Sequence, residues 1–135
     1  MIAADTSVVV AAFASWHEGH AASAAALSRR PRVPAHVILE SYSVLTRLPA
    51  PHTAAAGTVR EFLHLRFRAL PLVLSAKAYA ALIAEAAAAG IVGGAVYDAL
   101  IAFTAKSAGA VLLTRDRRAL PTYERIGVRF ELLGA

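Results

Sequence analysis

Apolar residues along this chain follow two patterns, and each pattern predicts a different kind of element. Short, nearly continuous apolar runs are typical of strands buried on both faces, whereas apolar positions three or four residues apart predict the inner face of a helix. Strands are predicted at residues 2–4, 69–74, 110–113 and 128–132, with a short extended piece at 32–34. Helices are predicted at residues 8–14, 20–30, 36–48, 53–67, 76–89 and 96–107, followed by one or two helical turns within 117–125.

Small polar residues, glycine and proline mark the ends of these elements. Thr6 and Ser7 are placed to cap the first helix, and Ser75 to cap the helix that Gly90 ends. Pro49 stops the third predicted helix. Because strands and helices alternate, we expect an α/β fold with a central, mostly parallel sheet and helices on both faces.

The chain is apolar, with 58% hydrophobic residues and a mean hydropathy of +0.55, but charges are spread through every apolar run. No uninterrupted apolar span reaches the roughly 20 residues that a bilayer requires. Asp5 interrupts an N-terminal apolar run that no Lys or Arg precedes, unlike a secretory signal. We therefore expect a cytoplasmic protein without a membrane segment. At 135 residues the chain suits one domain, residues 1–135.

The charge balance points to the kind of partner. Fourteen Lys and Arg residues against nine Asp and Glu give a formal net charge of +5. A basic chain tends to bind polyanions, nucleic acid first, or an acidic protein. The chain has no cysteine, which excludes disulfides, thiol catalysis and cysteine-based metal sites.

Three aspartates are present, and each follows a predicted strand or begins a predicted helix. Asp5 follows the first strand, Asp116 follows the strand at 110–113, and Asp98 lies near the start of a helix. Ligands bind beyond the carboxyl ends of the strands in open α/β sheets, so Asp5 and Asp116 meet there if their strands are neighbours. Glu40 lies on a mostly apolar helix face and is expected to point inward.

Each of these carboxylates also has a purely structural interpretation. Asp5 can cap a helix, Asp116 can stabilise a turn, and Asp98 can favour its helix dipole. Glu40 can pair with Arg47. Four acidic groups that converge, however, repel one another, and some stay protonated unless a cation joins them. Hard oxygen ligands favour Mg²⁺ or Mn²⁺, and such an ion activates water for attack on a phosphodiester.

Four motifs around these carboxylates resemble one protein family. The motifs are Asp5-Thr6-Ser7-Val8-Val9, Leu39-Glu40-Ser41-Tyr42-Ser43-Val44-Leu45-Thr46-Arg47-Leu48-Pro49, Tyr97-Asp98-Ala99-Leu100-Ile101-Ala102 and Leu112-Leu113-Thr114-Arg115-Asp116-Arg117-Arg118. In this order and at this spacing, over nearly the whole chain, they resemble the PIN-domain ribonucleases. The match is close to the VapC toxins of bacterial toxin–antitoxin pairs.

The resemblance implies a Rossmann-like three-layer fold and a Mg²⁺-dependent endoribonuclease, for which Mn²⁺ can substitute, that inhibits translation. The family's acidic site residues correspond to Asp5, Glu40, Asp98 and Asp116. It also implies RNA products with a 5′-phosphate and a 3′-hydroxyl, a homodimer, and silencing by a VapB-type antitoxin. Arg117 and Arg118 stand where some relatives carry a further carboxylate, which argues against a second tightly held metal ion.

Hydroxyl and guanidinium groups flank the acidic residues. Three hydroxyl residues are second-rank site residues, which can hold a metal-bound water or a phosphate, or can cap a helix: Thr6, Ser7 and Thr114. Arginine forks match phosphate oxygens, and one arginine run adjoins the last aspartate. The arginines expected to contact RNA are Arg115, Arg117 and Arg118.

Other polar and aromatic residues have ordinary explanations. His17 and His20 are three residues apart, not the four of a zinc-protease helix; we expect no zinc site there, and His20 is a candidate RNA contact beside the cleft. Trp16, Phe62 and Phe67 can stack bases, although core or interface packing is the expected role. The third and fourth predicted helices form a natural groove for an antitoxin helix, with core packing as the alternative. The residues in question are Leu45, Leu48, Phe62 and Leu63.

Two other functional classes fit the sequence less well. A signalling receiver domain needs a lysine after a late strand, whereas Lys77 and Lys106 lie in predicted helices. A catalytically silent PIN-fold module that binds RNA or an antitoxin is the alternative to the nuclease, and RNA binding without turnover would identify it.

Overall fold

A computed structural model describes residues 1–134 of the chain. The strands are β1 (Ile2–Ala4), β2 (Val111–Thr114) and β3 (Phe130–Leu132). The helices are α1 (Thr6–Phe13), α2 (His20–Ser28), α3 (Ala35–Thr46), α4 (Ala56–Arg66), α5 (Ala76–Ala89), α6 (Ala95–Ser107) and α7 (Leu120–Ile126), with a 3₁₀ turn η1 (Arg117–Ala119) before the last. The predicted α/β alternation is therefore confirmed.

The strands form one parallel sheet in the order β1-β2-β3 within residues 1–134. Isolated bridges extend it: Ala3 pairs with Arg32, and Pro34 pairs with Leu72. The prediction of a strand over residues 69–74 is wrong, because only Leu72 is paired there. Proline has no N–H to donate to a ladder, and Pro71 stands directly before Leu72.

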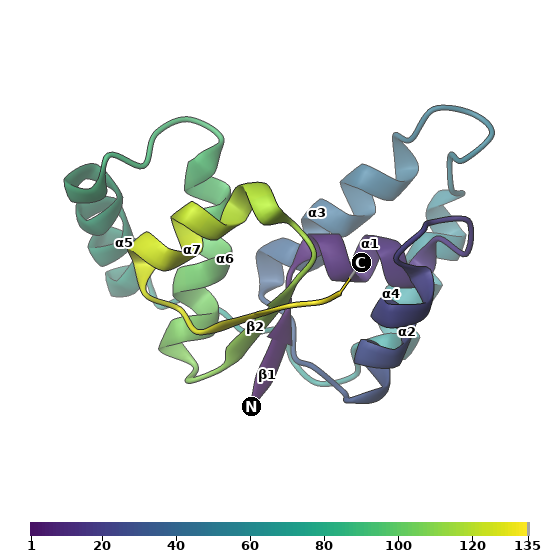
Figure 1. The fold of residues 1–135 in the computed structure, drawn as a ribbon, viewed down its shortest axis with the longest axis horizontal. Coiled ribbons are helices and arrows are strands. Elements are labelled where there is room, and N and C mark those ends of the chain that lie inside the picture. The colour runs from purple at the N-terminus through teal and green to yellow at the C-terminus, as the bar shows by residue number, and fades with distance from the viewer. Residues whose placement is uncertain (135) are drawn as a thin grey trace.

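Helices cover both faces of the sheet, which gives three layers (Figure 1). Helices α5, α6 and α7 lie to the left of β2 in that view, and α1 to α4 lie to the right. Helix α1 packs on α2 and α3, and α6 packs on α5 and α7. This arrangement confirms the expected three-layer fold with helices on both faces of a central sheet.

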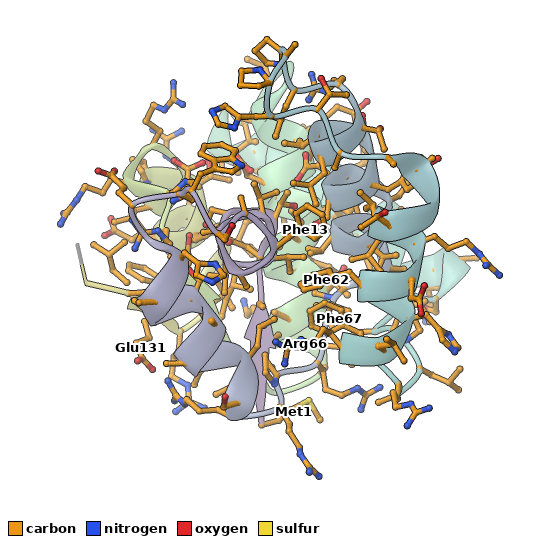
Figure 2. The ribbon with its side chains drawn as sticks, turned by 90° about the vertical axis from the view of Figure 1, so that its right-hand side faces the viewer. Met1, Phe13, Phe62, Arg66, Phe67 and Glu131 are labelled. Carbon is orange, nitrogen blue, oxygen red and sulfur yellow. The ribbon has the colours of Figure 1, made fainter. Side chains whose placement is uncertain are left out.

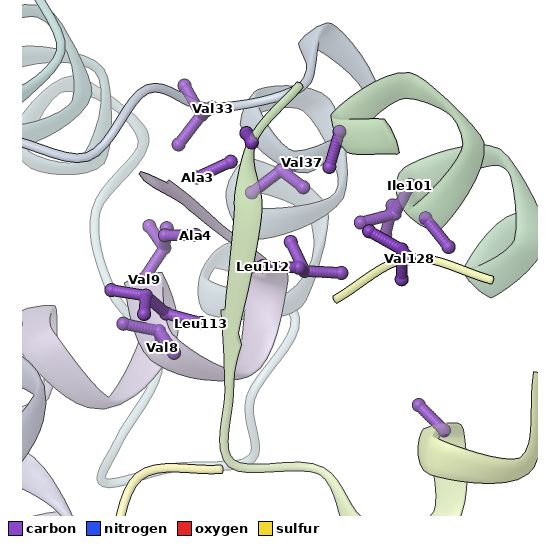
Figure 3. Packing of buried hydrophobic residues seen from close by; sticks show 14 of the residues in the cluster. Ala3, Ala4, Val8, Val9, Val33, Val37, Ile101, Leu112, Leu113 and Val128 are labelled. Atoms are coloured by element: carbon purple, nitrogen blue, oxygen red, sulfur yellow. The ribbon is translucent and has the colours of Figure 1, made fainter. Parts of the chain in front are cut away.

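Strand β2 lies at the centre of the core. Leu112 and Leu113 are both fully buried, and successive strand residues point to opposite faces of a sheet. Figure 3 shows Leu113 directed toward Val8, and Leu112 directed toward Ile101 and Val128. Strand β2 therefore packs against both helical layers. It also positions the residues that follow its carboxyl end.

An aromatic cluster joins α1 to α4 (Figure 2). The rings of Phe13 and Phe62 meet edge to face with centroids 5.1 Å apart. Phe62 and Phe67 are half-buried and pack against the core. Core packing is thus confirmed for these two phenylalanines, and neither is exposed for base stacking.

The ends of two helices show how far local sequence signals determined the fold. Helix α1 begins at Thr6, and its N-cap is Asp5, whose carboxylate accepts a hydrogen bond from the backbone N–H of Val8 at 3.3 Å. The expectation that Thr6 or Ser7 caps this helix is therefore wrong, because Asp5 has the extended backbone of an N-cap. Ser75 caps α5 as predicted, through Ala78 N–H at 3.1 Å.

None of the helices within the described part of the chain combines the length and the hydropathy needed to cross a bilayer.

Candidate active site

Four carboxylates from four different parts of the fold line one cleft. Strands β1 and β2 are parallel neighbours, so Asp5 and Asp116 meet beyond their carboxyl ends, as expected from the sequence. Helix α6 adds Asp98 from its first turn, and α3 adds Glu40. The cleft has a volume of about 510 Å³. Its other lining residues are Thr6, Ser7, Val10, His17, Glu18, Val44, Ile101, Arg115, Arg118 and Tyr123.

Asp5 is the most deeply placed of the four, with 2% of its surface exposed. Its Oδ1 accepts hydrogen bonds from the Ser7 hydroxyl at 2.5 Å and from the Val8 N–H at 3.3 Å. Its Oδ2 accepts from the Thr114 hydroxyl and from the Tyr123 hydroxyl, the latter at 2.8 Å. Burial raises the pKa of Asp5, although the four donors counteract this effect. Asp5 is both a cleft residue and the N-cap of α1.

Tyr123 is a site residue that could not be predicted from the sequence. It is fully buried on α7, and its hydroxyl reaches Asp5 across 118 positions of sequence. Burial and the neighbouring Asp5 carboxylate raise the pKa of Tyr123, so the hydroxyl stays protonated and donates. A buried tyrosine needs a hydrogen-bond partner, but nothing in the local sequence shows which residue that partner is.

Asp98 experiences the repulsion between the acidic groups most clearly. Burial raises its pKa from 3.8 to about 6, and the charges of Asp116, Glu40 and Asp5 add to the effect in that order. The four carboxylates are therefore close enough to interact electrostatically. At neutral pH, Asp98 is mostly ionised, yet it gains a proton readily when the pH falls.

Glu40 contacts one residue of α1 and one residue of its own helix, α3, four positions earlier. The Thr6 hydroxyl donates to its Oε1, and His36 Nε2 lies 3.7 Å from its Oε2. The His36 ring in turn stacks on Tyr97, with centroids 5.4 Å apart. Glu40 points into the cleft as predicted, and in the described structure it pairs with these residues rather than with Arg47.

Asp116 serves its local backbone as well as the cleft. Its Oδ1 accepts a hydrogen bond from the Arg118 N–H at 3.0 Å and so caps η1. Its own N–H donates to the Thr114 hydroxyl at 3.0 Å. The turn interpretation of Asp116 is therefore correct, and it does not compete with a role in the cleft.

The three hydroxyl residues contact carboxylates. Thr6 donates to Glu40, while Ser7 and Thr114 donate to Asp5. Ser7 also accepts from the Arg115 N–H at 2.8 Å, which ties α1 to the end of β2. Thr114 is fully buried beneath the cleft. These contacts support a role in orienting the carboxylates.

Two of the three arginines expected to contact RNA line the cleft, namely Arg115 and Arg118, whereas the exposed Arg117 is not among its lining residues in the described structure. The Arg115 guanidinium lies against Gly19: a Cβ added there would come 2.1 Å from its Cζ. The expectation that His20 lies beside the cleft is wrong. His17 lines the cleft, while His20 is engaged through Nδ1 with the carbonyl of Ala11 at 3.0 Å.

The donor set fits a hard divalent cation by its chemistry. It consists of carboxylate oxygens with hydroxyls behind them, which are ligands of Mg²⁺ and Mn²⁺. A bound cation would also relieve the repulsion that contributes to the raised pKa of Asp98. Across residues 1–134, no three acidic or histidine side chains are yet arranged as a metal-ligand group. Both oxygens of Asp5 are engaged by protein donors.

Comparison with known proteins agrees with this geometry. Residues 2–125 match the PIN domain family. Ribonuclease VapC40 of Mycobacterium tuberculosis is 53% identical over 133 residues, which cover 98% of this chain and 99% of the relative. Ribonuclease VapC27 of the same species is 44% identical over 128 residues, which cover 94% of this chain and 93% of the relative. The chain therefore belongs to the PIN-domain family and, within it, to the VapC-type ribonuclease toxins.

Proposed function

We propose that the cleft hydrolyses phosphodiester bonds within RNA in a metal-dependent reaction, and that the protein inhibits translation as the toxin of a toxin–antitoxin pair. The observation that carries this proposal is the convergence of four carboxylates in one cleft flanked by arginines. The full-length similarity to ribonucleases supports it. RNA binding without turnover is the competing function, and the experiment below separates the two.

The acidic residues would hold one Mg²⁺ ion, or Mn²⁺ in its place. The residues proposed to bind it, directly or through water, are Asp5, Glu40, Asp98 and Asp116. A bound ion lowers the pKa of water and stabilises charge on the phosphodiester. Around it, Ser7 and Thr114 orient Asp5, and Thr6 orients Glu40.

The chain's own side chains bind the substrate and move the proton. Arg115 and Arg118 are placed to bind phosphate oxygens, because both line the cleft and a guanidinium fork matches a phosphate. An ionised carboxylate of the set accepts the proton of the attacking water. Asp98 suits this role where it binds the ion through water rather than directly, since burial and its acidic neighbours raise its pKa above the usual value for aspartate.

The remaining proposals concern the setting of the protein. We propose one domain over residues 1–135, a cytoplasmic location, a homodimer, and inhibition by a VapB-type antitoxin. A cavity of about 800 Å³ between α3 and α4 is a candidate place for an antitoxin helix. It is lined by Ile38, Leu39 and Tyr42 rather than by Leu45, which is buried in the core. Leu63 contributes to this cavity and is also mostly buried.

Cleavage of total RNA by the purified protein tests the proposed activity. We expect discrete fragments with Mg²⁺ or Mn²⁺ and none after addition of EDTA. The new ends should be 5′-phosphates and 3′-hydroxyls; a mechanism that used the 2′-hydroxyl would leave a cyclic phosphate instead. The matched control is Asp5→Asn purified identically, because asparagine keeps the shape of the side chain and removes its charge.

Two outcomes would overturn the proposal. Equal cleavage by wild type and Asp5→Asn would identify a contaminating nuclease. Tight RNA binding by wild type without any fragments, in either metal, would favour the silent binding module.

Arg118 should contribute more to RNA binding than its neighbour Arg117. Both belong to η1, but Arg118 lines the cleft, whereas Arg117 is exposed outside its lining. Each phosphate contact to a single strand contributes about −0.7 to the slope of log affinity against log salt. We expect Arg118→Gln to reduce the slope by about this amount and Arg117→Gln to leave it nearly unchanged, as measured by fluorescence anisotropy of labelled RNA. If both variants reduced the salt slope equally, a position in the cleft lining would not determine which arginine contacts the RNA.

A further inference from the structure

One large aromatic side chain has no role in the core or in the carboxylate cluster. Trp16, the single tryptophan of the chain, lies in the connection between α1 and α2 and exposes 50% of its surface. Its ring stacks on that of His52 with centroids 3.9 Å apart and an interplanar angle of 26°. His52 lies in the connection between α3 and α4 and is itself exposed. Two loops that are distant in sequence thus build one small aromatic platform.

The platform adjoins the cleft. His17 follows Trp16 in sequence, its ring centroid lies 5.9 Å from that of Trp16, and it lines the cleft together with Glu18. The Nδ1 of His17 accepts a hydrogen bond from the Gly19 N–H at 2.9 Å, which holds this loop in a compact turn. Trp16 is therefore attached to the rim of the cleft by a short, internally bonded segment.

Packing does not account for the exposure of Trp16. An indole ring left half in water forgoes much of the free energy that its burial would contribute. The phenylalanines on the same side of the fold show the contrast: Phe13 and Phe62 pack against the core and against each other. A preformed stack with a large exposed ring instead matches the surfaces on which proteins stack unpaired bases.

The cleft residues supply the other half of RNA recognition. Arg115 and Arg118 also line the cleft, and guanidinium groups bind phosphates whatever the sequence. Stacking adds a contact that requires a base to be unpaired, because bases within a duplex already stack on their neighbours. Phosphate binding by arginine and base stacking by tryptophan together favour a single-stranded segment over a duplex.

We propose that Trp16, supported by His52, stacks on an unpaired base of the RNA that flanks the phosphodiester in the carboxylate cleft. This proposal rests on the proposed ribonuclease function, since it assumes RNA in that cleft. Trp16 acts as a positioning residue for the substrate, and it makes the protein selective for loops and single strands.

Tryptophan fluorescence tests the proposal directly, because Trp16 is the only tryptophan. Short single-stranded RNA is titrated into the full chain in EDTA, so that binding is observed without metal-dependent cleavage. We expect quenching of the emission by single-stranded RNA, much weaker quenching by a duplex of the same sequence, and a residual change with an abasic strand. Stacking of one base is worth about 1–3 kcal/mol; by anisotropy, Trp16→Ala should therefore bind single-stranded RNA roughly 5- to 150-fold more weakly.

Three comparisons make the result decisive. Trp16→Phe keeps an aromatic face and should recover most of the lost affinity. Tyr79→Ala removes an aromatic residue of equal exposure, 49%, on α5 outside the cleft lining, and should bind like wild type. An unchanged circular dichroism spectrum of Trp16→Ala shows that the fold is kept. The proposal would be overturned if single-stranded RNA left the fluorescence of wild type unquenched and if Trp16→Ala bound that RNA as tightly as wild type.

The outcome is separable from that of the nuclease assay. If wild type cleaves RNA but Trp16 neither is quenched nor affects binding, the stacking proposal fails and the nuclease stands. If Trp16 is quenched by single-stranded RNA but no condition yields cleavage, the stacking proposal stands and the nuclease fails.

Discussion

Replacing Asp98 with asparagine is expected to reduce RNA cleavage by about 10²- to 10⁴-fold, the usual contribution of a positioned acid or base, while making the folded protein more stable at neutral pH. Both effects have one cause. Asp98 lies in a cleft with Asp5, Glu40 and Asp116, and burial together with their charges raises its pKa from 3.8 to about 6. The ionised form of Asp98, which the reaction needs, therefore destabilises the folded protein.

The sign of the stability effect follows from the two pKa values. Between pH 3.8 and about 6 the folded state binds a proton at Asp98 more tightly than the unfolded chain does, so folding stability decreases as the pH rises through this range. The loss is complete well above pH 6 and absent well below pH 3.8. Because Asp98 is only half-buried, solvent screening reduces this loss of folding free energy to about 1 kcal/mol.

Thermal unfolding and cleavage rates measured across pH test these expectations together. The midpoint of unfolding of Asp98→Asn should exceed that of wild type at about pH 7 and converge with it at about pH 3.5. Wild-type cleavage should fall once the pH is low enough to protonate Asp98, and with the cation bound this pH lies below the value of about 6 for the metal-free cleft. Glu85→Gln, an exposed charge change on α5, should alter neither property. A variant that cleaves RNA normally, or one that is destabilised at neutral pH, would contradict this account of the cleft.

The sequence determined which carboxylates converge because their positions follow from chain topology. Asp5 and Asp116 each come directly after a strand, and neighbouring parallel strands end at the same edge of a sheet. Asp98 enters through a helix that begins beside that edge. For Asp5 and Asp116 only the adjacency of β1 and β2 had to be assumed, and the sheet order confirms it.

The supporting contacts could not be predicted in the same way because they depend on tertiary packing. Tyr123 reaches Asp5 only after α7 packs against α6, and no residue near either one signals that contact. The sequence favoured Thr6 or Ser7 as the N-cap, but Asp5, Thr6 and Ser7 are all good capping residues, so the sequence does not separate them. Their side chains differ in the structure: the Ser7 hydroxyl donates to Asp5 and accepts from Arg115.

Aromatic residues show the same limit. Phe62 and Trp16 offer similar apolar surfaces, but only Phe62 lies in a predicted helix whose periodicity indicates a buried face. The structure packs Phe62 of α4 against Phe13 of α1, whereas Trp16 lies in the connection between α1 and α2, next to His17 of the cleft lining. Apolar periodicity identifies the buried face of a helix, but it carries no information about a residue in a connection.

Asp5→Ala and Asp5→Asn should both lose cleavage activity but differ sharply in stability. Asp5 accepts four hydrogen bonds in a nearly water-free position, from Ser7, Val8, Thr114 and Tyr123. Alanine removes every acceptor, so the buried hydroxyls and the Val8 N–H lose their partner. Each such group costs about 1–3 kcal/mol, and loss of an N-cap costs about 1 kcal/mol. We expect the free energy of unfolding of Asp5→Ala to fall by about 3 kcal/mol or more.

Asparagine preserves most of this network, which is why it makes the better probe of catalysis. Its Oδ1 can still accept from Val8, and asparagine is as good an N-cap as aspartate. The hydroxyls of Thr114 and Tyr123 can rotate to accept from its amide N–H groups. Asp5→Asn also removes a charge whose burial raises the pKa of Asp5, so its unfolding free energy, measured in urea, should stay within about 1 kcal/mol of wild type. If alanine and asparagine proved equally stable, the four hydrogen bonds to Asp5 would contribute nothing to the fold, and Asp5 would be a site residue alone.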